Sequence, residues 1–351
     1  MWYNSSIGSC RTEQRVKGLK SIPSPPGERC ALSPGFGFFF DIDPGGIPMK
    51  KAIAILLLLC LLSGCAPADR PQTGLTFTDD LGRTVAVSDP RRVACLLGSF
   101  ADIWHLSGGD PIAAPDDAWL DYHLPMTEGA VNLGSTKTLS LEALFAAEPD
   151  LVLASTNSAQ HLQWQDTLEA AGIPVAYFEV SDFDGYLRLL AFCTGLTGRD
   201  DLYALHGTGV QAQIDEALTR AEARRTHPKV LYLRIAASGV RAKGSTGTVL
   251  GQMLLSLGCH NIADSDTSLL ETLSLEHILL EDPDYIFIVR QGDDEEAAQA
   301  QLDRFFAENP AWAGLTAVRE GRVFHLDKDL YNLKPNARWG EAYLLLEALL
   351  E

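Results

Sequence analysis

A short pattern of residues occurs twice in this chain and predicts two similar halves. Residues 138–142, Thr-Leu-Ser-Leu-Glu, recur letter for letter as residues 272–276. At one fixed spacing, each copy is followed by an acidic residue, a proline, an aspartate and an apolar run, at 148–153 and at 282–287. Each copy therefore predicts a short amphipathic helix, a turn and a buried strand. Because two copies are too few for a solenoid, the repeat predicts two similar α/β lobes.

The segment between the two copies predicts the connection between the lobes. A first helix is expected over about 184–192, and the Thr-Gly-Leu-Thr-Gly sequence at 194–198 breaks it. A second helix is expected over 199–225, and it would be roughly 40 Å long at about 1.5 Å per residue. Gly207 and Gly209 are its weak points, because glycine disfavours helix interiors. Apolar residues spaced three or four apart give this helix one buried face, formed by Val210, Ile214, Leu218 and Ala221.

Apolar runs alternate with helical periodicity on both sides of this segment. Strands are expected before it at 91–97, 112–114, 151–154 and 175–178, and after it at 229–234, 285–289 and 323–326. A hairpin with a polar-glycine turn is expected at 77–85, and a weaker echo pairs residues 106–109 with 255–258. Strands that alternate with helices form mostly parallel sheets. The predicted fold class is therefore α/β, with two Rossmann-like lobes and mostly parallel sheets joined by one long helix.

The N-terminal region has the pattern of a targeting segment that begins inside the given sequence. Residues 1–48 are rich in Gly, Pro and Ser and show no sustained periodicity. Met49 is followed by two lysines, an eleven-residue apolar run over 52–62, and small residues. A charged start, an apolar core too short to span a bilayer and small residues at the end are typical of a signal peptide. We expect residues 49–64 to be the signal peptide and residues 1–48 to be a leader upstream of the true start.

The end of this segment, Leu62-Ser63-Gly64-Cys65, resembles the lipobox of bacterial lipoproteins. The resemblance implies that Cys65 receives a diacylglycerol and becomes the first residue of the mature chain. Two or more acyl chains anchor a protein stably at a membrane. Residues 65–75, with Pro67 and Pro71, would then be a lipidated tether, and the protein would lie at the extracytoplasmic face of the bacterial cell membrane.

Composition and motif searches narrow the function classes. The chain carries a net charge of −18, and this acidity speaks against nucleic acid as a partner. Cys95, Cys193 and Cys259 lie far apart in apolar contexts, which predicts buried thiols and not disulfides. The histidines are scattered without metal-ligand spacing, so no site for a bare metal ion is expected. No nucleophile elbow, dinucleotide fingerprint or zinc-protease motif is present, and we predict a protein that is not an enzyme and needs no cofactor.

The residues after the tether resemble a family of substrate-binding lipoproteins of ABC importers. Thr78-Asp79-Asp80-Leu81-Gly82-Arg83, followed by Arg91-Arg92-Val93, is similar to a signature of the periplasmic binding proteins for ferric siderophores, vitamin B12 and haem. The resemblance covers about residues 76–350. It implies the class III fold, in which one long rigid helix joins two lobes that open only slightly. The expected parts are an N-terminal lobe at 76–183, a helical segment at 184–226 and a C-terminal lobe at 227–351.

The resemblance also gives the repeated glutamates a role. In this family one glutamate on each lobe docks onto arginines of the permease, and the matching positions are Glu142 and Glu276. Paired carboxylates suit guanidinium groups because the hydrogen bonds between them are charge-assisted. Both residues would also stabilise a helix N-terminus, so the two roles are compatible. The implied partners are an ABC permease, its ATPase and the ligand.

The ligand cleft of a two-lobed α/β protein lies at the carboxyl ends of its parallel strands. From the N-terminal lobe this nominates Ser99, Trp119, Tyr122, Asn157 and Asp182, and from the C-terminal lobe Arg234, Lys243, Arg290, Tyr331, Lys334 and Arg338. Clustered cations in so acidic a chain favour a negative metal chelate. The preferred ligand is a ferric siderophore. Cobalamin and haem stay open, with His123, Tyr122 or Tyr331 as axial ligands for haem, and so does a role as a sensor without transport.

Overall fold

The computed structural model describes residues 74–265, 270 and 274–351. The predicted leader, the signal peptide, Cys65 and the tether up to residue 73 lie outside the described residues, as do Thr272 and Leu273 of the second repeat copy. No helix in the described part of the chain is both long enough and apolar enough to cross a membrane.

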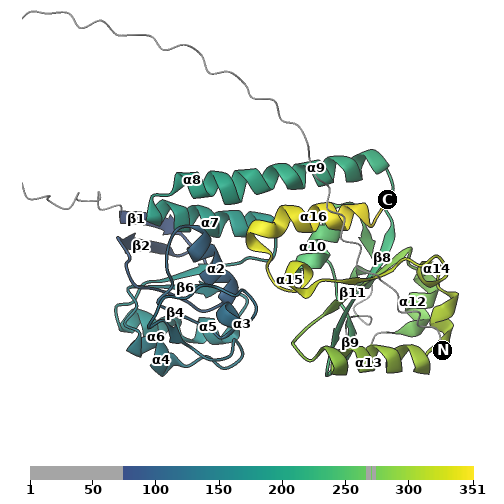
Figure 1. The fold of residues 1–351 in the computed structure, drawn as a ribbon, viewed down its shortest axis with the longest axis horizontal. Helices are drawn as coiled ribbons and strands as arrows, with labels where there is room; N and C mark the ends of the chain where they lie inside the picture. The colour runs from purple at the N-terminus through teal and green to yellow at the C-terminus, as the bar shows by residue number, and fades with distance from the viewer. Residues whose placement is uncertain (1–73, 266–269, 271–273) are drawn as a thin grey trace, which may run out of the picture. The chain divides into compact units, whose positions relative to one another are not determined.

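The N-terminal lobe is a doubly wound parallel sheet with a hairpin beside it (Figure 1). The hairpin is the antiparallel pair β1 (Gly74–Thr78) and β2 (Thr84–Ser88). The sheet has the spatial order β5 (Val131–Asn132), β4 (Ala113–Ala114), β3 (Val93–Cys95), β6 (Leu151–Ser155), β7 (Val175–Phe178). Its helices are α2 (Gly98–Leu106), α3 (Asp117–Leu120), α4 (Leu141–Ala146), α5 (Ala159–Gln163) and α6 (Gln165–Ala170). The predicted parallel sheet is confirmed, and the run at 116–123 contains the short helix α3.

The C-terminal lobe repeats this plan with a second, mostly parallel sheet. Its spatial order is β10 (His260–Asn261), β8 (Lys229–Ala236), β11 (Tyr285–Arg290), β12 (Val323–Leu326), and β9 (Gly239–Ala242) pairs antiparallel with β8. Its α-helices are α10 (Val249–Ser256), α12 (Leu275–Glu281), α13 (Glu295–Glu308), α14 (Thr316–Arg319), α15 (Lys328–Tyr331) and α16 (Trp339–Ala348). Single 3-10 turns are η2 (Ile262–Asp264), η3 (Pro310–Gly314) and η4 (Asn336–Arg338).

The sequence repeat corresponds to the same structural unit in both lobes. Ser140 and Ser274 cap α4 and α12, since each hydroxyl accepts the backbone N–H three residues later, at 3.1 and 3.4 Å. After each helix, the aspartate of the acid-proline-aspartate turn fastens the next strand to its neighbour. Asp150 accepts the backbone N–H of Arg92 at 2.9 Å ahead of β3, and Asp284 accepts that of Lys229 at 2.8 Å at the start of β8. The repeat therefore places a capped helix and a fastened central strand in each lobe.

The weaker echo is also structural, but its register differs by one residue from the predicted pairing. The left-handed glycine after α2 is Gly108, with a φ of 84°, and the one after α10 is Gly258, with a φ of 81°. Gly108 N–H donates to His105 and Gly258 N–H to Leu255, each to the carbonyl three residues back. The equivalent positions are thus Gly108 and Gly258, whereas the sequence alignment had placed Gly109 opposite Gly258.

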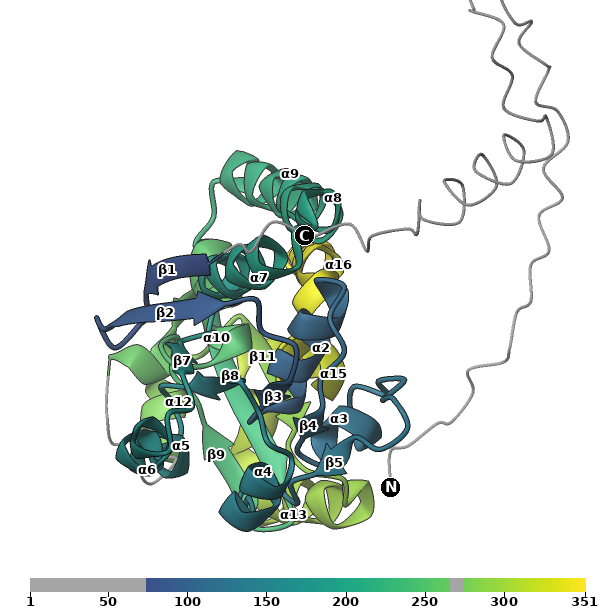
Figure 2. The same cartoon turned by 90° about the vertical axis from the view of Figure 1, so that its left-hand side faces the viewer.

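Two helices follow one another after the N-terminal lobe, and both lie along its top in Figure 1, where the second continues over the C-terminal lobe; Figure 2 shows the same helices from the side. The first, α7 (Phe183–Thr197), continues five residues beyond the predicted end at Phe192. That prediction is wrong because Thr194 packs inside the helix: it is buried, and its hydroxyl donates to the Leu190 carbonyl oxygen at 2.9 Å. Gly198, in the left-handed region, ends the helix.

The second of these helices joins the lobes. It runs through α8 (Asp200–Tyr203), the π-helical turn η1 (Ala204–Thr208) and α9 (Gly209–Arg224), with α8 over the N-terminal lobe and α9 over the C-terminal lobe (Figure 1). The π turn includes Gly207, whose predicted weakness it reflects. The predicted apolar stripe of α9 packs inward, with Val210, Ile214 and Ala221 buried. At its far end Arg224 forms an ion pair of 3.0 Å with Glu347 of α16, whose side chain is 2% exposed.

The apolar interior is continuous from one lobe to the other. One cluster takes residues from the inner faces of both sheets and from α7, α9 and α16, including Phe183, Ile214, Tyr232 and Trp339. Two further clusters lie on the other face of each sheet. Because both faces of each sheet are covered, the central strands are apolar throughout, as parallel strands usually are. The shared cluster makes the connection between the lobes a packed one.

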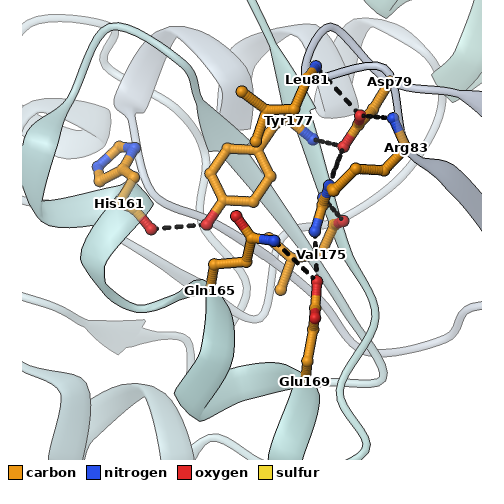
Figure 3. Close-up of polar contacts among 8 residues, drawn as sticks. All are labelled: Asp79, Leu81, Arg83, His161, Gln165, Glu169, Val175 and Tyr177. Atoms are coloured by element: carbon orange, nitrogen blue, oxygen red, sulfur yellow. Dashed lines mark hydrogen bonds and ion pairs between the residues drawn. The ribbon is translucent and has the colours of Figure 1, made fainter.

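The signature hairpin is fastened to the edge strand β7 by a network of polar contacts (Figure 3). Asp79, only 4% exposed, accepts the backbone N–H groups of Leu81 at 3.1 Å and Arg83 at 2.9 Å, and one of its oxygens also accepts the Arg83 Nε–H at 3.1 Å. The Arg83 guanidinium donates to the Val175 carbonyl oxygen at 2.9 Å, lies 4.8 Å from the centre of the Tyr177 ring and pairs with Glu169. The motif that carries the family resemblance therefore has a structural role in this chain, because it attaches the hairpin to β7.

Candidate functional site

A cavity of about 310 Å³ lies between the two lobes, where the parallel strands end. Leu97 follows β3 on its N-terminal side, and Arg234 in β8 and the turn before α10 form its C-terminal side. Five of the eleven predicted ligand-binding residues line it, namely Ser99, Tyr122, Asn157, Arg234 and Lys334. The sequence did not nominate several other lining residues, among them Asp117, Thr136, Ser181, Thr248 and Asn332. Asp117 and Ser181 could have been found, because each is a polar residue three positions after a predicted strand, whereas Thr136 and Thr248 do not closely follow a predicted strand.

Three of the remaining predicted residues have structural roles instead of facing this cavity. Asp182 caps α7, since its carboxylate accepts the Gly185 N–H at 2.8 Å, beside the lining residue Ser181. Trp119 packs, partly buried, against the continuous core. Tyr331 is 3% exposed, and its hydroxyl donates to the Ala342 carbonyl oxygen at 3.0 Å. The aromatic ring of Tyr331 lies in the apolar interior, because α15 presents this residue to the continuous core.

The other three predicted residues are cations that line neighbouring hollows. Arg290 donates to the Gly292 carbonyl oxygen at 2.7 Å and lies 3.6 Å from Glu295. Arg338 forms an ion pair with Glu341 at 2.7 Å, so carboxylates close in sequence neutralise both arginines. Lys243 lines a hollow of about 220 Å³ that shares Arg234 with the inter-lobe cavity. Of these three cations, Lys243 is the one that stands beside the cavity without a carboxylate partner among the described residues.

Two ionisable residues that line the cavity, Lys334 and Asp117, have shifted pKa values. The Lys334 ammonium lies 6.0 Å from the Phe100 ring, and burial lowers its pKa. Burial also raises the pKa of Asp117 to about 6, although its carboxylate accepts the Gly98 N–H at 3.0 Å. The Tyr122 hydroxyl donates to the Lys334 carbonyl oxygen and accepts the Lys334 N–H, both at 3.2 Å. An anionic ligand in this cavity would meet a weakly hydrated ammonium and a guanidinium.

The segment 332–338 connects the lobes a second time, and its first three residues line the cavity. Asn336, 1% exposed, donates from its side-chain amide to the Ser99 carbonyl oxygen at 2.9 Å and to Asp102 at 2.7 Å. Lys328 of the C-terminal lobe reaches Asp121 of the N-terminal lobe at 2.8 Å. No local sequence pattern signals these contacts, because the partners lie more than 200 positions apart. They fix the floor of the cavity.

The two repeated glutamates occupy equivalent surface positions. Glu142 and Glu276 are each the second residue of a serine-capped helix, and both are exposed. Within the described ranges neither carboxylate has an ion pair or a side-chain hydrogen bond. Their charges are therefore available to a partner, while each also stabilises the N-terminus of its helix.

The structure offers little for metal or nucleophile chemistry. The part of the chain that the structure describes has no group of three or more His, Cys, Asp and Glu side chains that could hold a metal ion. Cys95, Cys193 and Cys259 are buried free thiols, as predicted, and burial raises the pKa of each. A thiol that resists ionisation is a poor nucleophile. Of the haem-ligand candidates, His123 lies outside the inter-lobe cavity, Tyr331 is internal and the hydroxyl of Tyr122 is bound to backbone.

Comparisons with known proteins agree with this architecture. The model of the periplasmic binding protein family matches residues 93–330. The Fe(3+)-citrate-binding protein YfmC of Bacillus subtilis (strain 168) is 24% identical over 298 residues, which cover 80% of this chain and 89% of that protein. The Fe(3+) dicitrate-binding periplasmic protein FecB of Escherichia coli (strain K12) is 24% identical over 276 residues, covering 73% and 83%. The apo structure of the periplasmic heme-binding protein RhuT from Roseiflexus sp. RS-1 has a TM-score of 0.59 at 24% identity, over 74% of this chain and 97% of that one.

Proposed function

This chain belongs to the periplasmic binding protein family, and we propose that it delivers an iron chelate to the permease of an ABC importer. Proteins of this family bind solutes and are not enzymes. The proposed ligand is a ferric siderophore or a related ferric complex. The observation that carries the proposal is the inter-lobe cavity, which Arg234 and Lys334 line at the ends of the parallel strands. Two relatives that match most of the chain are named for binding ferric citrate.

The electrostatics of the cavity favour this ligand class over haem and cobalamin. Haem requires an axial ligand, and no histidine lines the cavity within the described ranges. The Tyr122 hydroxyl already exchanges hydrogen bonds with the backbone of Lys334. Cobalamin buries a large apolar surface, whereas this wall is formed mostly by Ser, Thr, Asn, Asp, Lys and Arg side chains. A small, polar and negatively charged complex suits the cavity best.

Delivery requires recognition by the permease, and we assign it to Glu142 and Glu276. Both carboxylates are exposed, and they lie on equivalent helices of the two lobes. The packed connection and the contacts of Asn336 hold the two lobes, so the spacing between the glutamates changes little when a ligand binds. Two charges at a fixed spacing can recognise a partner that has two similar halves, because each charge pairs with one half.

We further propose that Cys65 is lipidated and holds the protein at the extracytoplasmic face of the membrane. The support is the sequence at 62–65, which follows an apolar run of signal-peptide length. Labelling cells with a radioactive or clickable fatty acid tests this. The wild-type chain should carry the label, and Cys65→Ser should not. A labelled Cys65→Ser chain would contradict the assignment.

The ligand assignment is tested by thermal shift with the purified protein. The ligand series contains ferric citrate, ferric catecholate and hydroxamate siderophores, haem and cobalamin. A ligand at 100 times its dissociation constant adds about 2.7 kcal/mol of stability. With an unfolding entropy of about 2.1 cal/mol/K per residue, this corresponds to a rise of roughly 5 °C for a folded part of this size. A shift with a ferric chelate supports the proposal, and a folded protein that responds to none of them refutes it.

A further inference from the structure

One face of the hairpin formed by β8 and β9 carries three positive charges. Along β8, alternate side chains point to opposite faces of the sheet. Leu231, Leu233 and Ile235 belong to the cluster that includes α13, while Tyr232 belongs to the continuous core on the other face. Arg234 therefore lies on the Tyr232 face, which is turned away from α13.

The partner strand adds two more cations to the same face. Arg241 of β9 is the direct cross-strand partner of Arg234. The Lys243 N–H donates to the Tyr232 carbonyl oxygen at 2.9 Å, which continues the ladder by one residue beyond Ala242. Ala242 between them belongs to the α13 cluster, as the alternation requires. Arg234, Arg241 and Lys243, here called the cation trio, thus share one face, and with Gln291 and Ser238 they line a hollow of about 220 Å³.

The trio lacks negative partners in a chain that has many. Within the described ranges none of its three members forms an ion pair, and Arg234 donates only to the Tyr232 hydroxyl, at 3.0 and 3.3 Å. Eleven other Lys and Arg side chains of the described part do form ion pairs. Like charges directly opposite each other on two strands are destabilising. Burial and the two arginines also lower the pKa of Lys243, which agrees with the crowding.

The trio is continuous with the proposed ligand cavity. Arg234 lines both the trio's hollow and the inter-lobe cavity, which Lys334 also lines. Guanidinium groups pair with carboxylates through two parallel hydrogen bonds, and an ammonium adds a compact charge. A neutral ligand would cover these cations without replacing the water that it removes from them. A ligand with free carboxylates would neutralise them.

We propose that the cation trio binds peripheral carboxylates of the ligand and selects negatively charged polycarboxylate chelates over neutral ones. This inference rests on the proposed function, because it specifies the chemical class of the same ligand. Arg234 contacts the chelate from the cavity wall, and Arg241 and Lys243 hold carboxylates that extend into the adjoining hollow. The destabilising proximity of the three charges is retained because the bound anion relieves it.

Calorimetric titration of the purified protein tests the selection. The probes are ferric citrate, prepared with excess citrate, and ferrichrome, a neutral ferric trihydroxamate. Ferric citrate is expected to bind at least ten times more tightly than ferrichrome, and added NaCl should weaken only the ferric citrate complex. Arg241→Gln and Lys243→Gln are each expected to weaken ferric citrate binding by about tenfold, the effect of losing one charge-assisted hydrogen bond. Neither substitution should lower the melting temperature, because each relieves repulsion.

The matched control is Arg304→Gln, which removes one exposed positive charge from α13, on the other face of the same sheet. It should leave the affinity for ferric citrate within a factor of two. Equal or tighter binding of ferrichrome would overturn the inference, and so would unchanged affinity in both trio variants, while either result leaves the iron-chelate function standing. If no ferric chelate of either charge binds to the folded protein, the proposed function fails and this inference fails with it.

Discussion

Replacing Asn336 by glycine should loosen the second connection between the lobes. The side-chain amide of Asn336 donates to the Ser99 carbonyl oxygen at 2.9 Å and to the Asp102 carboxylate at 2.7 Å, from a residue that is 1% exposed. A hydrogen bond to a neutral group contributes about 0.5–1.5 kcal/mol, and one to a charged group about 1.5–3 kcal/mol. The expected loss is therefore about 2–4 kcal/mol. Glycine adopts the φ of 48° found here without strain, so the loss of stability measures the side-chain hydrogen bonds.

The assay combines denaturation with ligand dissociation. With an unfolding entropy of about 2.1 cal/mol/K per residue, the loss lowers the melting temperature by roughly 3–7 °C. Because the same bonds hold the floor of the cavity, ligand should also leave the Asn336→Gly protein faster in stopped-flow exchange. Asn336→Ala is the matched variant, since it loses the same bonds and adds about 1 kcal/mol of strain at positive φ. A stability loss below about 1 kcal/mol for Asn336→Gly, together with an unchanged dissociation rate, would refute the idea that this residue joins the lobes.

Three further predictions concern protonation, packing and docking. The pKa of Asp117 is raised by burial to about 6, so the folded protein holds this proton more tightly than the unfolded chain, and its ionisation costs stability as the pH rises from about 4 to 6. Asp117→Asn should remove a pH-dependent term of ~2–3 kcal/mol in total, of which about 1 kcal/mol develops between pH 5 and pH 7 and is measured by urea unfolding at these two values; an identical pH dependence in both proteins would count against this account. Arg224→Met leaves the buried Glu347 without its partner and should cost about 3–5 kcal/mol, whereas the double variant Arg224→Met/Glu347→Leu should be close to wild type in the same unfolding assay; equal losses in the single and double variants would contradict this. Glu142→Arg and Glu276→Arg should abolish uptake of radioactive iron while leaving ligand affinity and melting temperature unchanged, and normal uptake by both variants would show that docking lies elsewhere.

Much of the fold could be predicted from local sequence patterns. The elements that were not predicted share physical causes. The predicted bounds of β7 and β12 match the structure, because each is an apolar run between turns. The two-residue strands β5 and β10 were not predicted, since so short a strand has no periodicity. β9 was missed because glycines and cations made it resemble a loop. Its pairing with β8 depends on a turn that the alternating pattern does not reveal.

The candidate site residues were nominated from their positions at the ends of predicted strands, and the side chains that pair with them were given less weight. Ser99 and Arg234 were found because residues at the carboxyl ends of parallel strands meet at a cleft. Arg338 was nominated by the same rule, although Glu341 three residues later offered a visible partner for it. Tyr331 was nominated from its place before the last helix, and the structure buries it because the ring completes the core. Asp117 was overlooked although it follows the predicted strand at 112–114 by three positions, and the structure places it at the start of the short helix α3.

The sequence by itself determined the two-lobed α/β architecture, the helix between the lobes and the equivalence of Glu142 and Glu276. These features depend on periodicity, capping and repetition, which involve residues close together in the chain. Only the tertiary structure decided which of the described cations form ion pairs and which have no carboxylate partner. It places Arg241 opposite Arg234, and it brings Asn336 to Ser99 across 237 positions. Such contacts follow from how whole sheets and helices pack, because the free energy that selects them comes from burial summed over many residues and not from any local pattern.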